Sequence, residues 1–599
     1  MKNSIYHLAV SISHNSSAAL MRDGEIIISA CEERFNRKKN YVGYPKQSID
    51  YCLEKANITG EQLSRVAYTS IDQLGLLIKC RNTTRFSLKD YRDYYGKKYY
   101  IKKFNGEDCL DYLQWLRDAD QFTADEEFFD FSYLTDDVLK DPQLDVDLFR
   151  LEQRRLLSSH LGIDKKKIEF LDHHTCHAYY AYYGSPYRVS DCIVITLDGM
   201  GDGRNQTVWK VCNDKFQLIA ESSENDIGRI YKLATLLLGM RPDEHEFKVM
   251  GLAAYAKKYH VEKTFKVIKD ICKVEDMRIV SKDRPKDLYS YLKKNLKVHR
   301  FDNIAGAVQE LTERIATKLV SDIALKTGVS RFVLSGGIAM NVKMNKVISE
   351  LDEVEELFVC GSGGDESLSI GGCYLLNEKN ANNKHLNNLY LGYDINDEIQ
   401  NFDVHSFSGR FNVDSNVSKS KVAQLLLNGD IIGVIQGKAE FGARALGNRS
   451  ILANPSIRDS VQKINEAIKN RDFWMPFALS ILEENHKDYI ENPKNLKSPF
   501  MSIGFSTDPE KYHDIVAGIH PYDKTVRPQF VSKSHTPAFH ELISEFSKLS
   551  GVPALLNTSF NLHGEPIVDT IADAMRTFEL SGLNHLYINE KYLISKKTK

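Results

Sequence analysis

Short apolar runs that end at glycines, with helical stretches between them, recur through the first part of the chain. Strands are predicted at residues 6–13, 191–204, 331–335 and 357–360, and the second of these is expected to stop at Asp198-Gly199. The sequence RDGE (22–25) separates two apolar runs and predicts a hairpin. Helices are predicted over 300–325 and after the glycines that follow the last two strands. This alternation indicates an α/β domain with mostly parallel strands.

A second α/β pattern begins after the polar stretch NEKNANNKHLNN (377–388), which is the best candidate for a linker. Strands are predicted at 431–437 and 551–557, and helices around 460–470 and 571–579. Because 599 residues are too many for one core, we expect two domains, 1–390 and 391–599. Residues 75–160 are rich in Tyr, Asp, Lys and Phe, and predict a charged helical insertion in the first domain.

One short helix holds three histidines. In LDHHTCHAYYAYYGSP (171–186), Asp172 is a good N-cap, Gly184 is expected at C′ and Pro186 prevents continuation, so a helix is predicted over about 173–183. His173 and His177 are four residues apart, share one helix face and could bind one divalent cation. The spacing alone leaves the alternative open that His177 packs among the tyrosines and His173 is solvated.

Two aspartates lie in glycine-rich turns at predicted strand ends. Asp198 occurs in LDGMGDGR and Asp365 in GSGGDES, and LSGGIAMN is a third such turn. Glycines at these places let the backbone approach a phosphate. The carboxyl ends of strands in an open α/β sheet converge on one crevice, so both aspartates could meet the histidine pair there. Such a set of two His and two Asp suits Fe, Mn or Zn. The alternative is that the aspartates cap loops or hold Mg²⁺ through water.

Composition excludes several classes of protein. A formal net charge of −2, from 79 basic and 81 acidic residues, gives no electrostatic case for binding nucleic acid or an anionic membrane. An N-terminal apolar region and a run of eighteen apolar residues are both lacking, so neither secretion nor a membrane span is indicated. Ten cysteines without CxxC spacing fit a cytoplasmic enzyme with free thiols.

Basic and amide side chains gather in turns of the second half. GKAEFGARALGNRSILANP (437–455) carries two arginines around a glycine-rich turn, and NTSFNLHGEPIV (557–568) supplies amides and hydroxyls. Guanidinium groups match phosphate geometry, and Ser, Thr and Asn complete such a shell. Any single arginine could equally be solvated surface. As a set they suggest a polyphosphate or acyl-phosphate pocket, formed by Arg444, Arg449, Lys469, Arg471, Arg527, Asn557, Thr558, Ser559 and Asn561.

Taken in order, the motifs resemble one enzyme family. HHTCHA, TLDGMGDG, FKVMGLAAYA, LSGGIAMNVKMN, GGDES, EFGARALGNRSILANP, RPQF and NTSFNLHGEPIV are similar to the O-carbamoyltransferases of natural-product biosynthesis. That group includes the tobramycin, cephamycin, ansamycin and nodulation-factor carbamoyltransferases. The resemblance spans nearly the whole chain apart from the insertion at 75–160.

The resemblance implies a fold for each domain and a reaction for each. The first domain is expected to be actin-like (the ASKHA fold), as in threonylcarbamoyl-adenosine formation, and the second to resemble threonylcarbamoyl-adenylate synthases. The second domain would use Mg²⁺-bound ATP and carbamoyl phosphate to make carbamoyl-adenylate and release pyrophosphate. The first, with a divalent metal that we expect to be Fe²⁺, would pass the carbamoyl group to a hydroxyl of a small natural product.

The resemblance also assigns residues. Its metal ligands would be His173, His177, Asp198 and Asp365, and His14 would be the general base. Lys248, Arg444 and Arg449 would act in catalysis. The adenylate would contact Gly199, Gly201, Gly336, Gly337, Asn341 and Gly364. Carbamoyl phosphate and ATP would contact Lys438, Lys469, Arg471, Arg527, Asn557, Thr558, Ser559 and Asn561.

Three positions depart from the family pattern. Met475 stands where the family commonly has arginine, Leu479 where it has proline, and Phe247 where it has glycine. The departures put the details of the second active site in doubt.

Three other functions stay open from the sequence. An actin-fold ATPase or kinase would not need the second set of phosphate-binding turns. A tRNA-modifying protein would need a basic surface. A nucleotide-binding regulator with a degenerate second site would bind ATP without consuming it. We expect acceptor contacts in the insertion, and the chain could form a homodimer.

Overall fold

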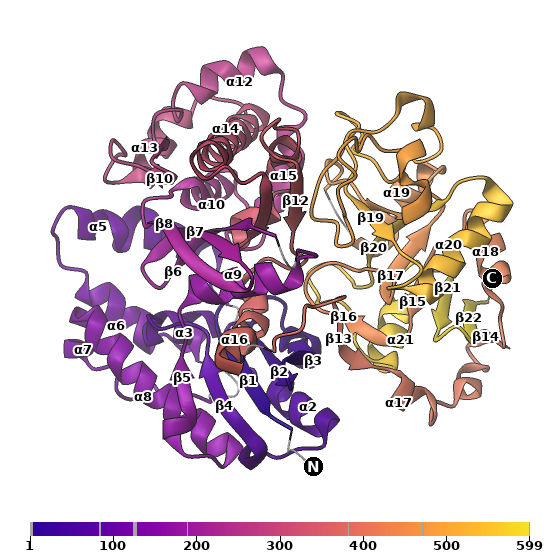
Figure 1. The fold of residues 1–599 in the computed structure, drawn as a ribbon, viewed down its shortest axis with the longest axis horizontal. Coiled ribbons are helices and arrows are strands. Elements are labelled where there is room, and N and C mark those ends of the chain that lie inside the picture. Colours follow the sequence, from indigo (N-terminus) through magenta and orange to yellow (C-terminus); the bar gives the residue numbers. More distant parts are fainter. Residues whose placement is uncertain are drawn as a thin grey trace. The chain divides into compact units, whose positions relative to one another are not determined.

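A computed structural model describes residues 4–82, 85–123, 128–187, 190–380, 382–469 and 472–597. The chain divides into two compact units, residues 1–386 and 387–599. Each is a mixed α/β unit (Figure 1). None of the helices in these described ranges is both long enough and apolar enough to cross a membrane.

The first sheet of the N-terminal unit contains the predicted hairpin. Its order is β3-β2-β1-β4-β5, with β1–β2 and β2–β3 antiparallel and β1–β4 and β4–β5 parallel. Asp23 and Gly24, which join β2 to β3, have φ of 51° and 82°, as a two-residue hairpin turn requires. The strands are β1 (Tyr6–Ser11), β2 (Ser17–Arg22), β3 (Glu25–Cys31), β4 (Leu63–Tyr68) and β5 (Ile168–Phe170).

The second sheet repeats that arrangement. Its order is β12-β11-β6-β7-β8, in which β6 and β7 and β7 and β8 are antiparallel hairpins and β6–β11 and β11–β12 are parallel. When the strands of each sheet are numbered in chain order, and the sheets are read from β3 and from β8, both have the order third, second, first, fourth, fifth. The strands are β6 (Cys192–Gly201), β7 (Arg204–Cys212), β8 (Lys215–Ser222), β11 (Arg331–Ser335) and β12 (Glu356–Val359). The repeated order supports a duplicated architecture.

Two predictions for these sheets were wrong. Neither sheet is mostly parallel, because short turns join the first three strands of each, and such connections produce antiparallel pairs. Strand β6 does not stop at Asp198-Gly199 but runs on to Gly201, where it pairs with Arg204 of β7.

Close packing of two helices joins the sheets. Helix α16 (Leu368–Leu376) contacts β1 and β2 of the first sheet, and α9 (His173–Gly184) contacts β6 and β11 of the second. A Cβ on Gly371 would lie 1.9 Å from the carbonyl oxygen of Cys176, and a Cβ on Gly372 would lie 2.9 Å from the Cβ of Ala9. The two glycines therefore permit α16 to lie directly against α9 and β1.

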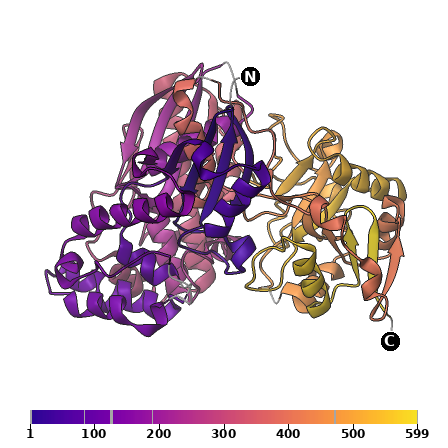
Figure 2. The same ribbon diagram turned by 90° about the horizontal axis from the view of Figure 1, so that it is seen from below.

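The insertion is helical, as predicted, and gathers on one side of the N-terminal unit (Figures 1 and 2). Its core is aromatic, since Phe122 and Phe149 are fully buried. The helices are α3 (Gly75–Asn82), α4 (Leu88–Asp93), α5 (Tyr100–Phe104), α6 (Leu110–Asp118), α7 (Asp136–Lys140) and α8 (Pro142–Leu161).

Eight further helices in the described part of this unit lie outside the insertion. They are α1 (Glu33–Asn36), α2 (Lys46–Ala56), α10 (Ile227–Leu237), α11 (Glu246–Ala253), α12 (Lys258–Phe265), α13 (Leu288–Leu296), α14 (Phe301–Thr327) and α15 (Val342–Ser349). A small hairpin, β9 (Lys273–Glu275) and β10 (Arg278–Val280), lies between α12 and α13 in the chain. Residues 337–340, where the α-helix after Gly336-Gly337 was expected to begin, form a 3₁₀ turn ahead of α15.

The C-terminal unit is built on an eight-stranded mixed sheet of order β14-β22-β21-β15-β17-β20-β18-β19. Ile451 and Ala453, alternate residues of β17, enter a buried cluster with Leu556 of β20 and Phe578 of α21. The strands are β13 (Tyr390–Asp394), β14 (Phe411–Ser415), β15 (Ile432–Ile435), β16 (Lys438–Glu440), β17 (Arg449–Ala453), β18 (Ala478–Leu482), β19 (Pro528–Val531), β20 (Ala554–Ser559), β21 (His585–Ile588) and β22 (Tyr592–Lys596). The helices are α17 (Asn396–Ile399), α18 (Lys419–Leu427), α19 (Asp459–Ile464), α20 (Pro537–Ser550) and α21 (Ile571–Leu580).

Candidate functional site

The histidine helix begins where the sequence predicts. The side chain of Asp172 accepts a hydrogen bond from the Thr175 backbone N–H at 2.7 Å and caps α9. Gly184 is the last helical residue rather than C′, and Ser185 is the C-cap. The cap fixes the register of the first turn, so that His173 and His177 face the same way.

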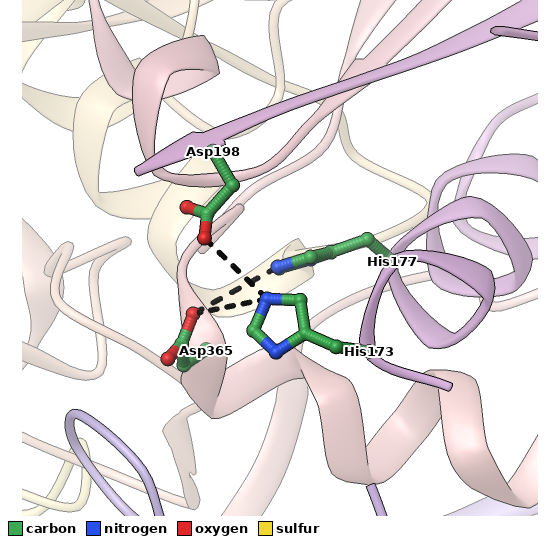
Figure 3. A group of neighbouring side chains, drawn as sticks. All are labelled: His173, His177, Asp198 and Asp365. Carbon is green, nitrogen blue, oxygen red and sulfur yellow. Dashed lines mark ion pairs between the residues drawn. The ribbon is translucent and has the colours of Figure 1, made fainter. Parts of the chain in front are cut away.

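Four side chains from distant parts of the sequence point toward one another in the N-terminal unit (Figure 3). His173 and His177 come from α9, Asp198 from β6, and Asp365 from the turn before α16. His173 Nε2 lies 3.4 Å from Asp198 Oδ2 and 3.7 Å from Asp365 Oδ1, and His177 Nε2 lies 3.8 Å from Asp365 Oδ1. The four ligand atoms are within 4.8 Å of one another, and we call this group the His₂Asp₂ cluster.

The electrostatics of the His₂Asp₂ cluster fit a cation. Both Nε2 atoms are buried, and neither has a hydrogen-bond partner among the described residues. Burial alone would lower the pKa of His173, but the carboxylates of Asp365 and Asp198 raise it to about 9. Burial would raise the pKa of each aspartate, yet the neighbouring imidazoles lower both. Two unpartnered imidazole nitrogens facing two carboxylates form a donor set that a divalent metal would satisfy.

Contacts from neighbouring residues hold two side chains of the His₂Asp₂ cluster in place. The backbone N–H of Gly337 donates to Asp198 Oδ1 at 2.9 Å, which leaves Oδ2 directed at the cluster. The hydroxyl of Ser335 lies 3.5 Å from His177 Nδ1. Such contacts orient metal ligands and tune their basicity.

The third histidine of the motif has a structural role. His174 Nδ1 is 2.7 Å from the hydroxyl of Thr196, and its Nε2 is 3.0 Å from the carbonyl oxygen of Arg204. Burial, with the charge of His173, lowers the pKa of His174 to about 3, so this ring is neutral. His174 therefore ties α9 to the second sheet.

Several glycines expected to contact an adenylate make room for protein atoms. A Cβ on Gly201 would lie 2.3 Å from Cδ2 of His173, and one on Gly336 (φ 97°) would lie 2.2 Å from the carbonyl oxygen of Leu197. A Cβ on Gly364 would lie 2.5 Å from Glu366 Oε2. Gly199 faces open space, since a Cβ there would have no atom within 4 Å. The glycines thus shape the strand ends around the His₂Asp₂ cluster.

The predicted general base, His14, lies within electrostatic reach of two carboxyl groups. His14 is half-buried in the loop between β1 and β2, and its Nε2 is buried without a hydrogen-bond partner in the described part of the chain. Burial raises the pKa of Glu366, and the charge of His14 opposes that rise. Burial would also raise the pKa of Asp243, but Lys232, Arg81 and His14 together lower it. Since Glu366 follows Asp365 directly, the loop of His14 lies near the His₂Asp₂ cluster.

The other two predicted residues of the N-terminal unit lie on helices. Lys248 is half-buried on α11. Burial and the positive charge of Lys248 together lower the pKa of His245 to about 4. Asn341 caps α15 through Met344 N at 3.0 Å and exchanges hydrogen bonds with Gln309. These bonds give Asn341 a structural role.

Arg449 is the largest fully buried side chain of the molecule's described residues, and its surroundings argue against catalysis. Nε donates to Asp569 O, Nη1 to Gln436 O and Asn448 O, and Nη2 to Tyr393 O and Gly437 O, at 2.8–3.2 Å. A guanidinium has five N–H groups, and all five are directed at carbonyl oxygens. We therefore assign Arg449 to the support of the 437–449 turn.

Three predicted residues of the C-terminal unit contact one another. The ammonium of Lys469, which is 5% exposed, donates to Ser559 O at 2.5 Å and to Asn561 O at 3.0 Å and Oδ1 at 2.6 Å. Asn561 Nδ2 in turn donates to Glu565 O at 2.7 Å. The lysine thus fixes the turn after β20.

Asn557 connects β20 to the neighbouring strand β18 and to the 437–449 turn. Its Nδ2 donates to Ser480 Oγ at 2.9 Å and to Ala445 O at 3.2 Å, next to Arg444. The amide of Gln529 accepts from Ser480 Oγ at 2.7 Å and donates to Leu446 O at 2.9 Å. Thr558 lies beside Asn557 on β20.

The remaining predicted residues are separate or fall outside the described ranges. Arg444 and Arg527 are half-buried, and Lys438 is exposed at the start of β16. Arg471 lies outside the described residues. Of the three departures, Met475 and Leu479 are buried, at 4% and 0% exposed, and Phe247 is exposed.

Sequence reasoning missed residues that organise both units. Asp202, the second aspartate of LDGMGDGR, binds the backbone N–H of His173, and Glu440 Oε1 accepts N–H bonds from Leu446, Asn448 and Arg449 at 2.6–3.1 Å. Asp202 lies in LDGMGDGR and Glu440 in GKAEFGARALGNRSILANP, two motifs of the sequence analysis. Their position after a strand in a turn was the available signal, but it does not distinguish a backbone clamp from a ligand.

Comparison with known sequences assigns the family. A family described as Carbamoyltransferase N-terminus matches residues 7–374, and Carbamoyltransferase C-terminus matches residues 423–596. The chain belongs to the carbamoyltransferase family. The predicted resemblance is thereby confirmed, and the chain is a transferase.

Relatives align along most of the chain. Nodulation protein NolNO of Sinorhizobium fredii is 29% identical over 603 residues, covering 98% of this chain and 79% of that protein. An uncharacterised protein of Methanocaldococcus jannaschii is 29% identical, covering 98% of this chain and 99% of that protein. The 3'-hydroxymethylcephem-O-carbamoyltransferase of Amycolatopsis lactamdurans is 26% identical, covering 58% of this chain and 64% of that enzyme.

Similarity to solved structures is weak. HypF of T. kodakarensis superposes with a TM-score of 0.33 at 12% identity, covering 63% of this chain and 48% of that one. At this level no inference about function rests on the superposition.

Proposed function

We propose that the protein is an ATP-dependent O-carbamoyltransferase that works in two steps. The C-terminal unit would make carbamoyl-adenylate from carbamoyl phosphate and ATP, and the N-terminal unit would transfer the carbamoyl group to a hydroxyl of a small acceptor. The observation that carries the proposal is the His₂Asp₂ cluster, with two buried, unpartnered imidazole nitrogens facing two carboxylates, in a chain of the carbamoyltransferase family.

The atoms of the two steps balance. Carbamoyl phosphate and water give carbamate and phosphate, and a carbamate oxygen attacks the α-phosphorus of ATP, which releases pyrophosphate. The acceptor hydroxyl then attacks the carbamoyl carbon, the bond to the adenylate oxygen breaks, and AMP leaves. The hydroxyl proton needs a base, and the adenylate provides the leaving group that carbamate itself lacks.

In the N-terminal unit we assign the metal to His173, His177, Asp198 and Asp365, and Fe²⁺ is our expectation for its identity. A divalent cation bound by these residues would supply Lewis-acid stabilisation of the carbonyl oxygen or of the adenylate phosphate. His14 would take the hydroxyl proton, and its unpartnered buried Nε2 supports that role in the part of the chain that the structure describes. We also propose an actin-like fold for this unit, supported by the two sheets of equal strand order.

In the C-terminal unit we propose that Mg²⁺-bound ATP and carbamoyl phosphate bind at the 437–449 turn. Arg444 is half-buried there and Lys438 is exposed, so both charges lie where a phosphate from solvent can reach them. Arg449, Lys469 and Asn557 would hold the backbone of this site through the hydrogen bonds described above. Met475 is buried and stands where the family commonly has arginine, and we expect that it does not contact phosphate.

The proposal is tested without an acceptor. Purified protein is incubated anaerobically with Fe²⁺, Mg²⁺, ATP and carbamoyl phosphate, pyrophosphate is quantified, and carbamoyl-adenylate is sought by mass spectrometry. We expect both products, and Arg444→Ala as the control should form neither at a comparable rate. If folded, metal-loaded protein binds ATP but forms neither product, the proposal fails and a nucleotide-binding regulator is the better assignment.

The insertion is where we propose the acceptor binds. It joins the core next to the His₂Asp₂ cluster, since residues 70–72, which lead into it, are bonded to Asp202 beside His173. A chain in which 75–160 is exchanged for a relative's segment should change acceptor choice while pyrophosphate release persists. Unchanged acceptor choice and affinity would contradict this assignment.

A further inference from the structure

The carboxylate of Asp202 accepts hydrogen bonds from two separate segments. On one side its donors are the Ser70 hydroxyl at 2.6 Å, Ile71 N at 3.0 Å and Asp72 N at 2.9 Å. On the other side Oδ2 accepts from the backbone N–H of His173 at 2.7 Å. Asp202 itself has φ of 48°, a left-handed conformation that the tight β6–β7 turn imposes.

Each side of this clamp leads to a different functional part. His173 N is in the first turn of α9, and the side chain of the same residue carries an Nε2 atom of the His₂Asp₂ cluster. Residues 70–72 follow β4 and lead into the insertion, where Arg150 of α8 donates to Ile71 O at 2.6 Å and to Asp72 Oδ1 at 2.9 Å. A continuous path of hydrogen bonds therefore runs from the insertion to a metal ligand.

We propose that Asp202 is a positioning residue that couples metal binding in the His₂Asp₂ cluster to the placement of residues 70–72, the loop that leads into the insertion. The inference rests on the metal-binding part of the proposed function. The carboxylate that fixes the backbone of His173 also fixes residues 70–72. Because coupling between two sites is reciprocal, metal binding stabilises the loop by as much as the placed loop stabilises the metal.

The chemistry of the carboxylate is needed for this coupling. Four N–H and O–H groups converge on it, and a carboxylate accepts through both oxygens. An asparagine in its place keeps one accepting oxygen and presents an NH₂ group to donors on the other side. The asparagine of Asp202→Asn has nearly the same shape but can accept hydrogen bonds from only one of the two segments. The substitution therefore removes the connection between the segments without changing the residues of either one.

Asp145 offers a matched control. It also uses its carboxylate to hold backbone, accepting from Gly75 N at 3.1 Å, Leu76 N at 3.2 Å and the Tyr133 hydroxyl at 3.0 Å. Those bonds lie within the insertion and none of them reaches α9. Asp145→Asn should therefore cost similar stability without touching the path to His173.

The test uses Co²⁺ alone as the probe, without nucleotide or acceptor, and the full-length protein. Calorimetry and the visible absorption of bound Co²⁺ report affinity and ligand geometry, and hydrogen exchange reports the amides of residues 70–73 with and without Co²⁺. For Asp202→Asn we expect about ten-fold weaker binding, the scale of an outer-shell ligand contact, an altered Co²⁺ spectrum and no metal-dependent protection of 70–73. Wild-type protein and Asp145→Asn should show tight binding and metal-dependent protection.

Two results would overturn the inference. Asp202→Asn could bind Co²⁺ like the wild type with the same protection of residues 70–73, which would make Asp202 a simple turn brace. Alternatively, Asp202→Asn and Asp145→Asn could weaken binding equally, which would show general destabilisation. This assay contains only protein and Co²⁺, so its result does not depend on whether the protein forms pyrophosphate or carbamoyl-adenylate. Failure of the inference can therefore be told apart from failure of the proposed reaction.

Discussion

Adding one methyl group at Gly201 should disrupt the proposed metal site in the His₂Asp₂ cluster. A Cβ there would lie 2.3 Å from Cδ2, 2.4 Å from Cγ and 2.6 Å from Nε2 of His173. Ordinary carbon contacts are about 3.5 Å or longer, so the imidazole must move by about 1 Å. His173 is 3% exposed and its backbone is held by Asp202, so the ring cannot move without losing its position opposite Asp198.

The size of the effect follows from the tolerance of metal coordination. Metal–ligand distances vary by only about 0.2 Å, so a shift of about 1 Å removes His173 from the ligand set. We expect Gly201→Ala to weaken Co²⁺ binding by more than about 100-fold, beyond the usual cost of an outer-shell change. The overpacking should also lower stability by about 1–3 kcal/mol.

Gly199→Ala is the matched control for this prediction. It lies two residues earlier in the same motif, and its Cβ would have no atom within 4 Å. Calorimetric titration with Co²⁺ measures both variants, and circular dichroism checks that both are folded. Wild-type affinity in folded Gly201→Ala would refute the argument that this glycine makes room for the metal ligand.

Four further predictions concern the protonation of His173, the catalytic roles of His14 and Arg444, and the structural role of Arg449. Metal affinity should rise with pH up to about 9, because the carboxylates raise the pKa of His173 to about 9 despite burial and a bound metal needs the neutral ring; titrations with Co²⁺ between about pH 6 and 9 check this, and a flat profile would contradict it. His14→Gln should slow carbamoyl transfer by about 10²–10⁴-fold, the usual share of a general base, while pyrophosphate release without acceptor is unchanged; equal loss of both would assign His14 to folding or adenylate binding. Arg449→Lys should lower the melting temperature strongly, because the five carbonyl bonds cannot be remade by an ammonium. Arg444→Lys should leave the melting temperature unchanged and reduce carbamoyl-adenylate formation, and the opposite order of effects would reverse the two assignments.

Local features of both units were predictable because they depend on neighbouring residues. Asp23-Gly24 favours a two-residue hairpin turn wherever the strands lie, and the structure has that hairpin. Asp172 caps α9, and a spacing of four places His173 and His177 on one face of any helix. The family was also predictable, since the motifs occur in order along the chain.

Predictions that depended on partners distant in the sequence fared differently. Strand β6 passes Asp198 because β7 pairs with it as far as Gly201, and an isolated strand has no signal for where its partner ends. Arg449 looked like a phosphate ligand because it follows a glycine-rich turn. Its five carbonyl partners are spread along the chain between Tyr393 and Asp569, so its burial was not visible in the motif.

By itself the sequence determined the local pieces: the histidine helix, the glycine-bounded strand ends, the helical insertion and the family to which the chain belongs. Only the tertiary structure decided which pieces meet. Asp198 joins His173 because β6 and α9 pack together, and Asp365 joins them because Gly371 and Gly372 let α16 lie against α9 and β1. Side-chain spacing within a helix is set by backbone geometry over a few residues, whereas the meeting of separate elements is set by packing between surfaces distant in the sequence.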